Sequence, residues 1–332
     1  MAAVVLPQLL AKTDTIDINC RHGCVLAMGE ITLTLRKLEE KSDPQVVYLS
    51  NQRVAELNEL IITFLDKNFY RGMSGDLMKS CTSSYIKNCS LAKLQATPEC
   101  LGRKRVPKAI LNSLVKHSLT PLQAVLVGEM GDRENIQAYR WSEARTQSVL
   151  ALTKLVKTVG YGGGIDSFAE PKNFNKVIEC LLRALQEYTL DNRGDIGAWV
   201  REAAMSSLYE IVTTCPPDLL APEQVHEIVV GFMQQAVEKI DRTRGLGGRL
   251  CCQLIHHQPR IPYIREHSKL LEIFPADADS VLWLFADHTF PLFCELLSLP
   301  DYSKRVLLGL SASIGQLTES LGSCIDHLYI NL

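Results

Sequence analysis

Apolar residues recur with the period of an α-helix through most of this chain. They occupy positions i, i+3, i+4, i+7 and i+8 of successive segments, which gives each segment one apolar face and one polar face. The pattern predicts amphipathic helices that turn a single stripe toward a core. Two examples are Leu57, Leu60, Ile61, Phe64 and Leu65, and Val177, Ile178, Leu181, Leu182 and Leu185.

The predicted helices follow one another as outer and inner members of pairs. Pro171 and Pro222 suit the first turn of a helix, where the missing amide proton costs nothing. The expected pairs are residues 4–11 with 18–37, 49–65 with 71–88, 170–188 with 197–213, a helix opening at 221–223 with 241–257, and 290–299 with 303–317.

An arginine opens five of these apolar runs and small residues follow it. A helix pair of the HEAT type needs about 40–47 residues, and the separation of Arg201 from Arg244 falls in that range. Longer separations predict insertions. Because one pair cannot bury its apolar face alone, the chain is predicted to be all-α, a HEAT/armadillo-type α-α superhelix. The runs begin at Arg21, Arg145, Arg201, Arg244 and Arg305, with a weaker copy at Arg71.

One stretch of the chain lacks the helical periodicity. Residues 95–139 hold several prolines and glycines and only short apolar pieces, so they are predicted to be irregular. The domain prediction is therefore two helix pairs in residues 1–92, an irregular segment in 93–140, and three to four repeats in 141–332. The basic run at residues 103–105 is either a solvated loop or a patch for an acidic partner or a targeting receptor.

A carboxylate lies three or four residues before three of the marker arginines. This spacing predicts a pair at a helix start, favourable as an ion pair and with the helix dipole. The expected pairs are Asp17 with Arg21, Asp241 with Arg244, and Asp301 with Arg305.

Glycines inside the predicted helices require a compensation, because each costs about 1 kcal/mol relative to alanine. Close packing is expected in the helices of Arg21 and Arg305. The segment around Gly245, Gly247 and Gly248 is expected to be soft.

Composition narrows the functional classes. A net charge of −2 over 332 residues argues against a dedicated nucleic-acid binder. No apolar run reaches the ~18 residues of a membrane span. Eleven cysteines without a pairing pattern indicate reduced thiols in a cytosolic protein.

Candidate chemistry is sparse. Cys20 and Cys24 flank His22, but no second ligand pair follows, so buried thiols are favoured over a metal site. The glycines at 162–164 lack the Lys-Ser/Thr of a phosphate loop. No nucleophile elbow or His-Glu-x-x-His helix occurs. The sequence predicts no catalytic residues, no metal and no cofactor.

The connector before residue 200 is the candidate protein-binding site. It combines a cation, a carboxylate and a large aromatic in Arg193, Asp195 and Trp199. Exposed Trp and Arg are common interface anchors. The alternative is that Trp199 packs against the next repeat.

Several runs together resemble tubulin-folding cofactor D. They occur in the order of that family and cover nearly the whole chain outside residues 95–139. The matching runs are Asn19–Ile31, Phe69–Gly72, Asp191–Met205, Glu238–Arg242, Phe274–Pro275, Val306–Leu310 and Leu317–Ser320.

The resemblance implies a HEAT-repeat chaperone that binds β-tubulin and takes part in assembly and disassembly of the αβ-heterodimer after chaperonin release. It implies cofactors E and C and an ADP-ribosylation-factor-like small GTPase as partners, and stimulation of GTP hydrolysis by tubulin without an active site in this protein. It also implies a cytoplasmic location, at the microtubule-organising centre and cell junctions. We expect a central fragment of such a chaperone that lacks some internal repeats. The alternative is a HEAT scaffold or transport adaptor for another cargo.

Overall fold

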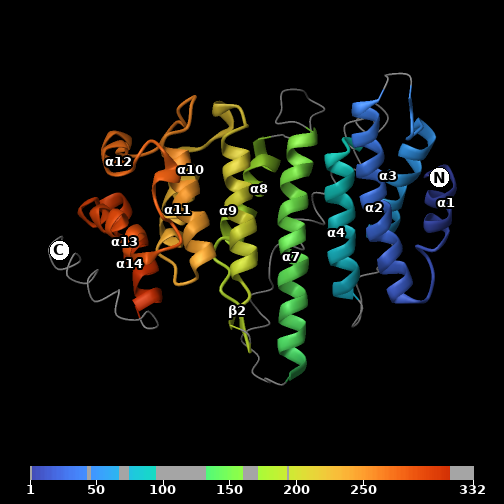
Figure 1. The fold of residues 1–332 in the computed structure, drawn as a ribbon, viewed down its shortest axis with the longest axis horizontal. Helices are drawn as coiled ribbons and strands as arrows, with labels where there is room; N and C mark the ends of the chain where they lie inside the picture. The colour runs from blue at the N-terminus through green and yellow to red at the C-terminus, as the bar shows by residue number, and fades with distance from the viewer. Residues whose placement is uncertain are drawn as a thin grey trace. The chain divides into compact units, whose positions relative to one another are not determined.

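Helices carry nearly all of the regular structure in this chain. The computed structural model describes residues 2–42, 46–66, 75–94, 132–159, 171–192 and 194–314. Within these ranges the only sheet is a hairpin of two short strands. The five arginine-led runs all lie in helices (Figure 1). The predicted all-α helical-solenoid class is confirmed. No helix in the described ranges is both long and apolar enough to span a bilayer.

The chain divides into two compact units. The first comprises Met1–Cys180 and Thr189–Val200, and the second comprises Leu181–Tyr188 and Arg201–Leu332. The division passes through two helices, α8 (Pro171–Ala184) and α9 (Ala198–Val212). The other helices of the first unit are α1 (Ala2–Ala11), α2 (Ile18–Lys41), α3 (Asn51–Asp66), α4 (Gly75–Leu91) and α7 (Asp132–Val159).

Helix α4 is central to the first unit, since it packs against both α2 and α7 (Figure 1). Gly29 permits the approach of α2: a Cβ at this position would lie 3.2 Å from Tyr85 Cα. The buried Tyr85 hydroxyl donates a hydrogen bond of 2.9 Å to the carbonyl of Leu57 in α3. Toward α7, the Ser83 and Ser148 hydroxyls lie 3.0 Å apart. Small and aromatic side chains thus set the spacing of these helices.

Helix α10 (Pro222–Ala236) holds the same position in the second unit. It packs against α11 (Asp241–Ile255) and α14 (Pro300–Ile314), and its last nine residues are buried. Pro222 stands at its first position, as its fixed φ favours. The shorter elements of this unit are η3 (Pro217–Leu219), α12 (His267–Ile273), η4 (Ala278–Ser280), α13 (Ala286–Cys294) and η5 (Glu295–Ser298).

Most predicted helices are found within a few residues of their expected bounds, and the differences are informative. Helix α7 begins at Asp132, inside the segment expected to be irregular, so Arg145 lies in its middle and not near its start. The other four strong marker arginines lie within the first two turns of their helices. The short α12 was not predicted. Residues 95–131, with the basic run at 103–105, and Arg71 lie outside the described residues.

The glycines of α11 are explained by close packing, and the expectation of a soft segment was wrong. A Cβ at Gly247 would lie 2.8 Å from the backbone nitrogen of Ala236, which is closer than real Cβ atoms approach. A Cβ at Gly248 would lie 2.3 Å from the ring of Trp283. Close backbone contact with α10 therefore offsets the low helix propensity of Gly247.

Replacing Gly247 by alanine should destabilise the protein despite the better helix propensity of alanine. The clash is with backbone, which cannot rotate away, so we expect a loss of about 1–3 kcal/mol in the free energy of unfolding. Gly23→Ala is the matched control, because a Cβ there meets nothing within 4 Å. It should gain up to about 1 kcal/mol. Urea denaturation of both variants measures this, and a stabilised Gly247→Ala would contradict the packing account.

His267 is a buried imidazole at the start of α12. Its Nε2 lies 2.6 Å from the carbonyl oxygen of Ile255, so the neutral ring donates from Nε2. Burial lowers the pKa of His267, the hydrogen bond to Ile255 opposes this shift, and electrostatic interaction with Arg260 and His256 lowers the pKa further. The folded state therefore disfavours the protonated ring.

Acidification should destabilise the fold through this residue. The unfolded chain binds its proton near the ordinary histidine pKa of about 6.5, and the folded chain binds it only at lower pH. The contribution of the neutral His267 ring to the free energy of unfolding is therefore fully present above about pH 6.5 and is lost as the pH falls below that value. His267→Gln keeps an amide donor for Ile255 and should flatten the pH dependence of the melting temperature between pH 7.5 and 5.5. The exposed His288→Gln is the control, and equal slopes for parent and His267→Gln would refute the assignment.

Candidate functional site

The connector that precedes α9 is a hairpin. Strands β1 (Leu190–Asp191) and β2 (Gly194–Asp195) pair antiparallel, with Leu190 opposite Asp195 and Asp191 opposite Gly194. Gly194 has a φ of 109°, which side chains with a Cβ rarely adopt. The glycine therefore makes the tight turn possible.

Three hydrogen bonds fix the end of this hairpin onto α9. The carbonyl of Thr189 accepts from the amides of Ile196 and Gly197, at 3.1 and 3.0 Å. Asp195 Oδ1 accepts from the amide of Ala198 at 3.1 Å, so Asp195 caps the start of α9. Its position three residues before the first helical amide is a capping signal that the sequence reasoning missed. The carboxylate has a structural task besides any contact with a partner.

The other candidate residues of the connector differ in what they present. Trp199 is half-buried, and Leu190 exposes 65% of its surface. Arg193 lies outside the described residues. The connector is thus a fixed turn with partly exposed apolar side chains.

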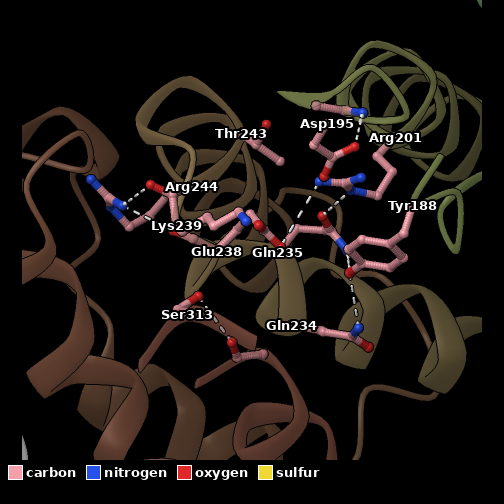
Figure 2. A network of polar contacts seen from close by, with 12 residues as sticks. Tyr188, Asp195, Arg201, Gln234, Gln235, Glu238, Lys239, Thr243, Arg244 and Ser313 are labelled. Atoms are coloured by element: carbon pink, nitrogen blue, oxygen red, sulfur yellow. Dashed lines mark hydrogen bonds and ion pairs between the residues drawn. The ribbon is translucent and has the colours of Figure 1, made fainter. Parts of the chain in front are cut away.

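Arg201, in the second unit, is fully buried among polar groups (Figure 2). Its Nε donates to Gln235 Oε1 at 2.9 Å, and its Nη1 donates to the carbonyl of Glu187 at 2.6 Å. The guanidinium carbon lies 4.1 Å from the centre of the Tyr188 ring, within cation–π range. The carboxylate of Glu238 lies 3.9 Å from Nη2. The buried charge is therefore bonded on several sides.

Tyr188 also contributes to this cluster through its hydroxyl group. The hydroxyl accepts hydrogen bonds from Gln234 Nε2 at 3.1 Å and Gln235 Nε2 at 2.9 Å. Burial raises the pKa of Tyr188, so the phenol stays neutral. The C-terminal turn of α10 is thereby bonded to residues 187–188.

Arg244 makes a second buried cluster on the turn between α10 and α11. Its Nη1 donates to the carbonyl of Glu238 at 2.9 Å, and its Nη2 donates to Asp241 at 2.6 Å and to the carbonyl of Leu284. Glu238 is therefore held by Arg201 at its side chain and by Arg244 at its backbone (Figure 2). Both arginines are structural donors inside the core.

The predicted helix-start pairs differ in outcome. Asp241 and Arg244 pair at 2.6 Å. Asp301 instead accepts from Arg265 at 2.8 Å, and Arg305 pairs with Glu227 at 2.5 Å, because carboxylates of other elements lie closer than the sequence neighbour. Asp17 accepts from the amides of Asn19 and Cys20, at 2.9 and 3.4 Å, so it is the N-cap of α2, which also contains Arg21.

Most thiols of the described residues are buried. All nine cysteines in these ranges are free, and eight are buried. Burial raises the pKa of Cys81 and of Cys89 to about 12, which disfavours the reactive thiolate. No group of three or more potential metal-ligating side chains gathers in the same ranges. Asn88, in the Asn-x-Ser glycosylation pattern at residues 88–90, is buried, and its Nδ2 donates to Glu30 Oε1 at 2.8 Å.

Comparisons with known proteins agree with the resemblance found in the sequence. Residues 226–332 match the family model described as "Tubulin folding cofactor D C terminal". "Tubulin-specific chaperone D" of Dictyostelium discoideum is 27% identical over 181 residues, which cover 47% of this chain and 12% of that protein. This chain therefore spans a small part of the length of that relative. No solved structure matches the chain.

Removing the Arg201 guanidinium should cost far more than removing a surface arginine. Arg201→Met keeps the volume but deprives Gln235 and the Glu187 carbonyl of a buried donor, so we expect a loss of about 3 kcal/mol in the free energy of unfolding. Arg242→Met is the control, since Arg242 is exposed and pairs with Glu202 at 2.9 Å. Its loss should stay below about 1 kcal/mol. Equal losses in chemical denaturation would show that the buried cluster contributes no special stability.

Proposed function

Because this chain is related to tubulin-folding cofactor D, we propose that it binds β-tubulin and takes part in assembly and disassembly of the αβ-heterodimer after chaperonin release. The support is the match of residues 226–332 to the family model and the relative named as a tubulin-specific chaperone. The chain covers 12% of that relative, so the activity of the longer protein is carried over here as a proposal.

The proposed contact surface is the connector of Arg193, Asp195 and Trp199. The observation that supports it most is the way the connector is fixed: Asp195 caps α9, and Thr189 anchors the hairpin end through two backbone bonds. A surface that is already ordered loses less entropy on binding than a mobile one. Tryptophan and arginine are the side chains that most often anchor interfaces.

The proposed role in GTP hydrolysis is indirect. We propose that the chain supports GTP hydrolysis by tubulin together with cofactors C and E, and that an ADP-ribosylation-factor-like small GTPase is a further partner. Arg201 and Arg244 are buried and bonded to groups of this chain, which favours a structural role for them over contact with a phosphate. In this proposal the chain binds tubulin and supports its GTP hydrolysis without supplying a catalytic group.

The proposed location follows from the proposed partner. We propose a cytoplasmic location, with association at the microtubule-organising centre and at cell junctions. A HEAT scaffold or transport adaptor for another cargo remains the alternative, because helical solenoids serve many binding functions.

The binding experiment is retention of purified tubulin by the immobilised full chain. Trp199→Ala combined with Arg193→Ala should weaken retention about thirtyfold, since loss of a central aromatic anchor costs about 2 kcal/mol or more. Phe285→Ala is the control, because Phe285 is an aromatic side chain that is 56% exposed outside the connector. Circular dichroism of each variant reports helical content.

The outcomes separate the surface from the function. Equal retention by the parent and the double variant would remove the connector as the contact site. Failure of the parent chain itself to retain tubulin would contradict the proposed function and favour the adaptor alternative. Loss of helicity in the double variant would show that Trp199 is a packing residue.

A further inference from the structure

The chain from Arg242 to Arg265, which comprises most of α11 and the loop after it, carries ionisable side chains of one charge sign. Between Asp241 and Glu266 the chain contains five arginines and two histidines but no Asp, Glu or Lys. Such a stretch needs carboxylates from outside it to neutralise its arginines. The structure shows which of its arginines receive one.

Four of the five arginines have carboxylate partners and one does not. Among the described residues, Arg260 forms no ion pair or hydrogen bond through its guanidinium, and its side chain is exposed. The four paired arginines are Arg242 with Glu202, Arg244 with Asp241, Arg249 with Asp279, and Arg265 with both Glu223 and Asp301.

The loop that carries Arg260 is firmly held. Ile261 and Ile264, on either side of its tip, are 5% and 7% exposed. The Tyr302 hydroxyl donates to the carbonyl of Arg265 at 2.5 Å, and the Arg265 side chain reaches Asp301 at 2.8 Å. Residues 260–265 are therefore anchored by the buried side chains of Ile261 and Ile264 and by the hydrogen bonds of Arg265.

Tyr263 occupies a conformation that is unfavourable for a residue with a Cβ. Its φ is 64°, in the left-handed region, and its side chain is 50% exposed. Its hydroxyl has no hydrogen-bond partner in the part of the chain that the structure describes. Because an exposed aromatic side chain stands on this backbone outlier, the position points to a function of the side chain.

The other charges of the loop are compensated. Arg265 pairs with Glu223 and Asp301, each at 2.8 Å, and Glu266 lies 3.3 Å from Lys269. An unpaired guanidinium on the same ordered loop as an exposed phenol is suited to a carboxylate with an apolar neighbour.

We propose that the loop from Gln258 to Glu266 is a docking surface for an acidic peptide segment of a partner protein. The Arg260 guanidinium pairs with a carboxylate of that segment, and the Tyr263 ring packs against its backbone or an apolar side chain. Nucleic acid is the less suitable partner, because phosphate binding draws on several free cations and only Arg260 is unpaired in this stretch.

This surface uses other residues than the proposed tubulin contact. It comprises residues 258–266 of the second unit, whereas the connector comprises residues 189–200 of the first. Its test does not need tubulin, so the two proposals can fail independently.

The experiment measures the fluorescence anisotropy of a labelled peptide of alternating glutamate and glycine on the full chain at low salt. Arg260→Ala should weaken binding about tenfold, and Arg260→Glu should abolish it, because a charge-assisted pair is lost or reversed. Arg249→Ala is the matched control: Arg249 is an exposed arginine of the same segment, already 3.7 Å from Asp279, and its loss should change affinity less than about twofold. A lysine-glycine peptide should not bind.

Tyr263→Gly tests whether the tyrosine is kept for binding. Glycine adopts a φ of 64° without strain, so the melting temperature should stay level or rise while peptide affinity falls. A clear fall in melting temperature would make Tyr263 a packing residue and overturn its assigned role. Equal affinity of parent and Arg260→Ala, or tighter binding of a single-stranded oligonucleotide than of the acidic peptide, would overturn the docking surface.

Discussion

The burial of two arginine side chains is the constraint on which the second unit depends. A guanidinium cannot leave water unless its donors are bonded, so Arg201 and Arg244 require acceptors at fixed places. Those acceptors come from Gln235, from the carbonyls of Glu187 and Glu238, and from Asp241. Because the acceptors lie on different elements, satisfying the charges also fixes how those elements are placed.

The same turn is where the backbones come closest. Gly247 of α11 faces the backbone of Ala236, and Gly309 of α14 faces the carbonyl of Gln234. The Ser313 hydroxyl donates to the carbonyl of Val237 at 2.7 Å. The C-terminal end of α10 is therefore a hub, in which small residues allow approach and polar groups satisfy the carbonyls that a helix end leaves free.

The buried arginines of the hub are out of a partner's reach, because Arg201 is 0% and Arg244 2% exposed. Exposed apolar side chains lie instead in the hairpin before α9 and in the loop before α12, where Leu190 and Tyr263 reach solvent. This arrangement is compatible with the proposed binding role, in which residues inside the helix pairs fix the geometry and residues between the pairs contact a partner. The match to the cofactor D model begins at residue 226, so it covers most of α10 and the loop before α12 but neither the hairpin before α9 nor Arg201.

The sequence by itself determined the helices and the position of most arginines near their starts, because helical period, proline placement and capping are local properties. It also carried the resemblance to tubulin-folding cofactor D, with which the comparisons agree. Which side chains form ion pairs and hydrogen bonds with one another was decided only by the tertiary structure. Asp301 lies four residues before Arg305, yet Asp301 forms an ion pair with Arg265, and Arg305 forms one with Glu227. The glycines of α11 suggested softness until the backbone of Ala236 was seen beside Gly247. Asp195, expected at an interface, caps a helix. A side chain's partner depends on which elements pack together in three dimensions, and spacing along one chain does not contain that information.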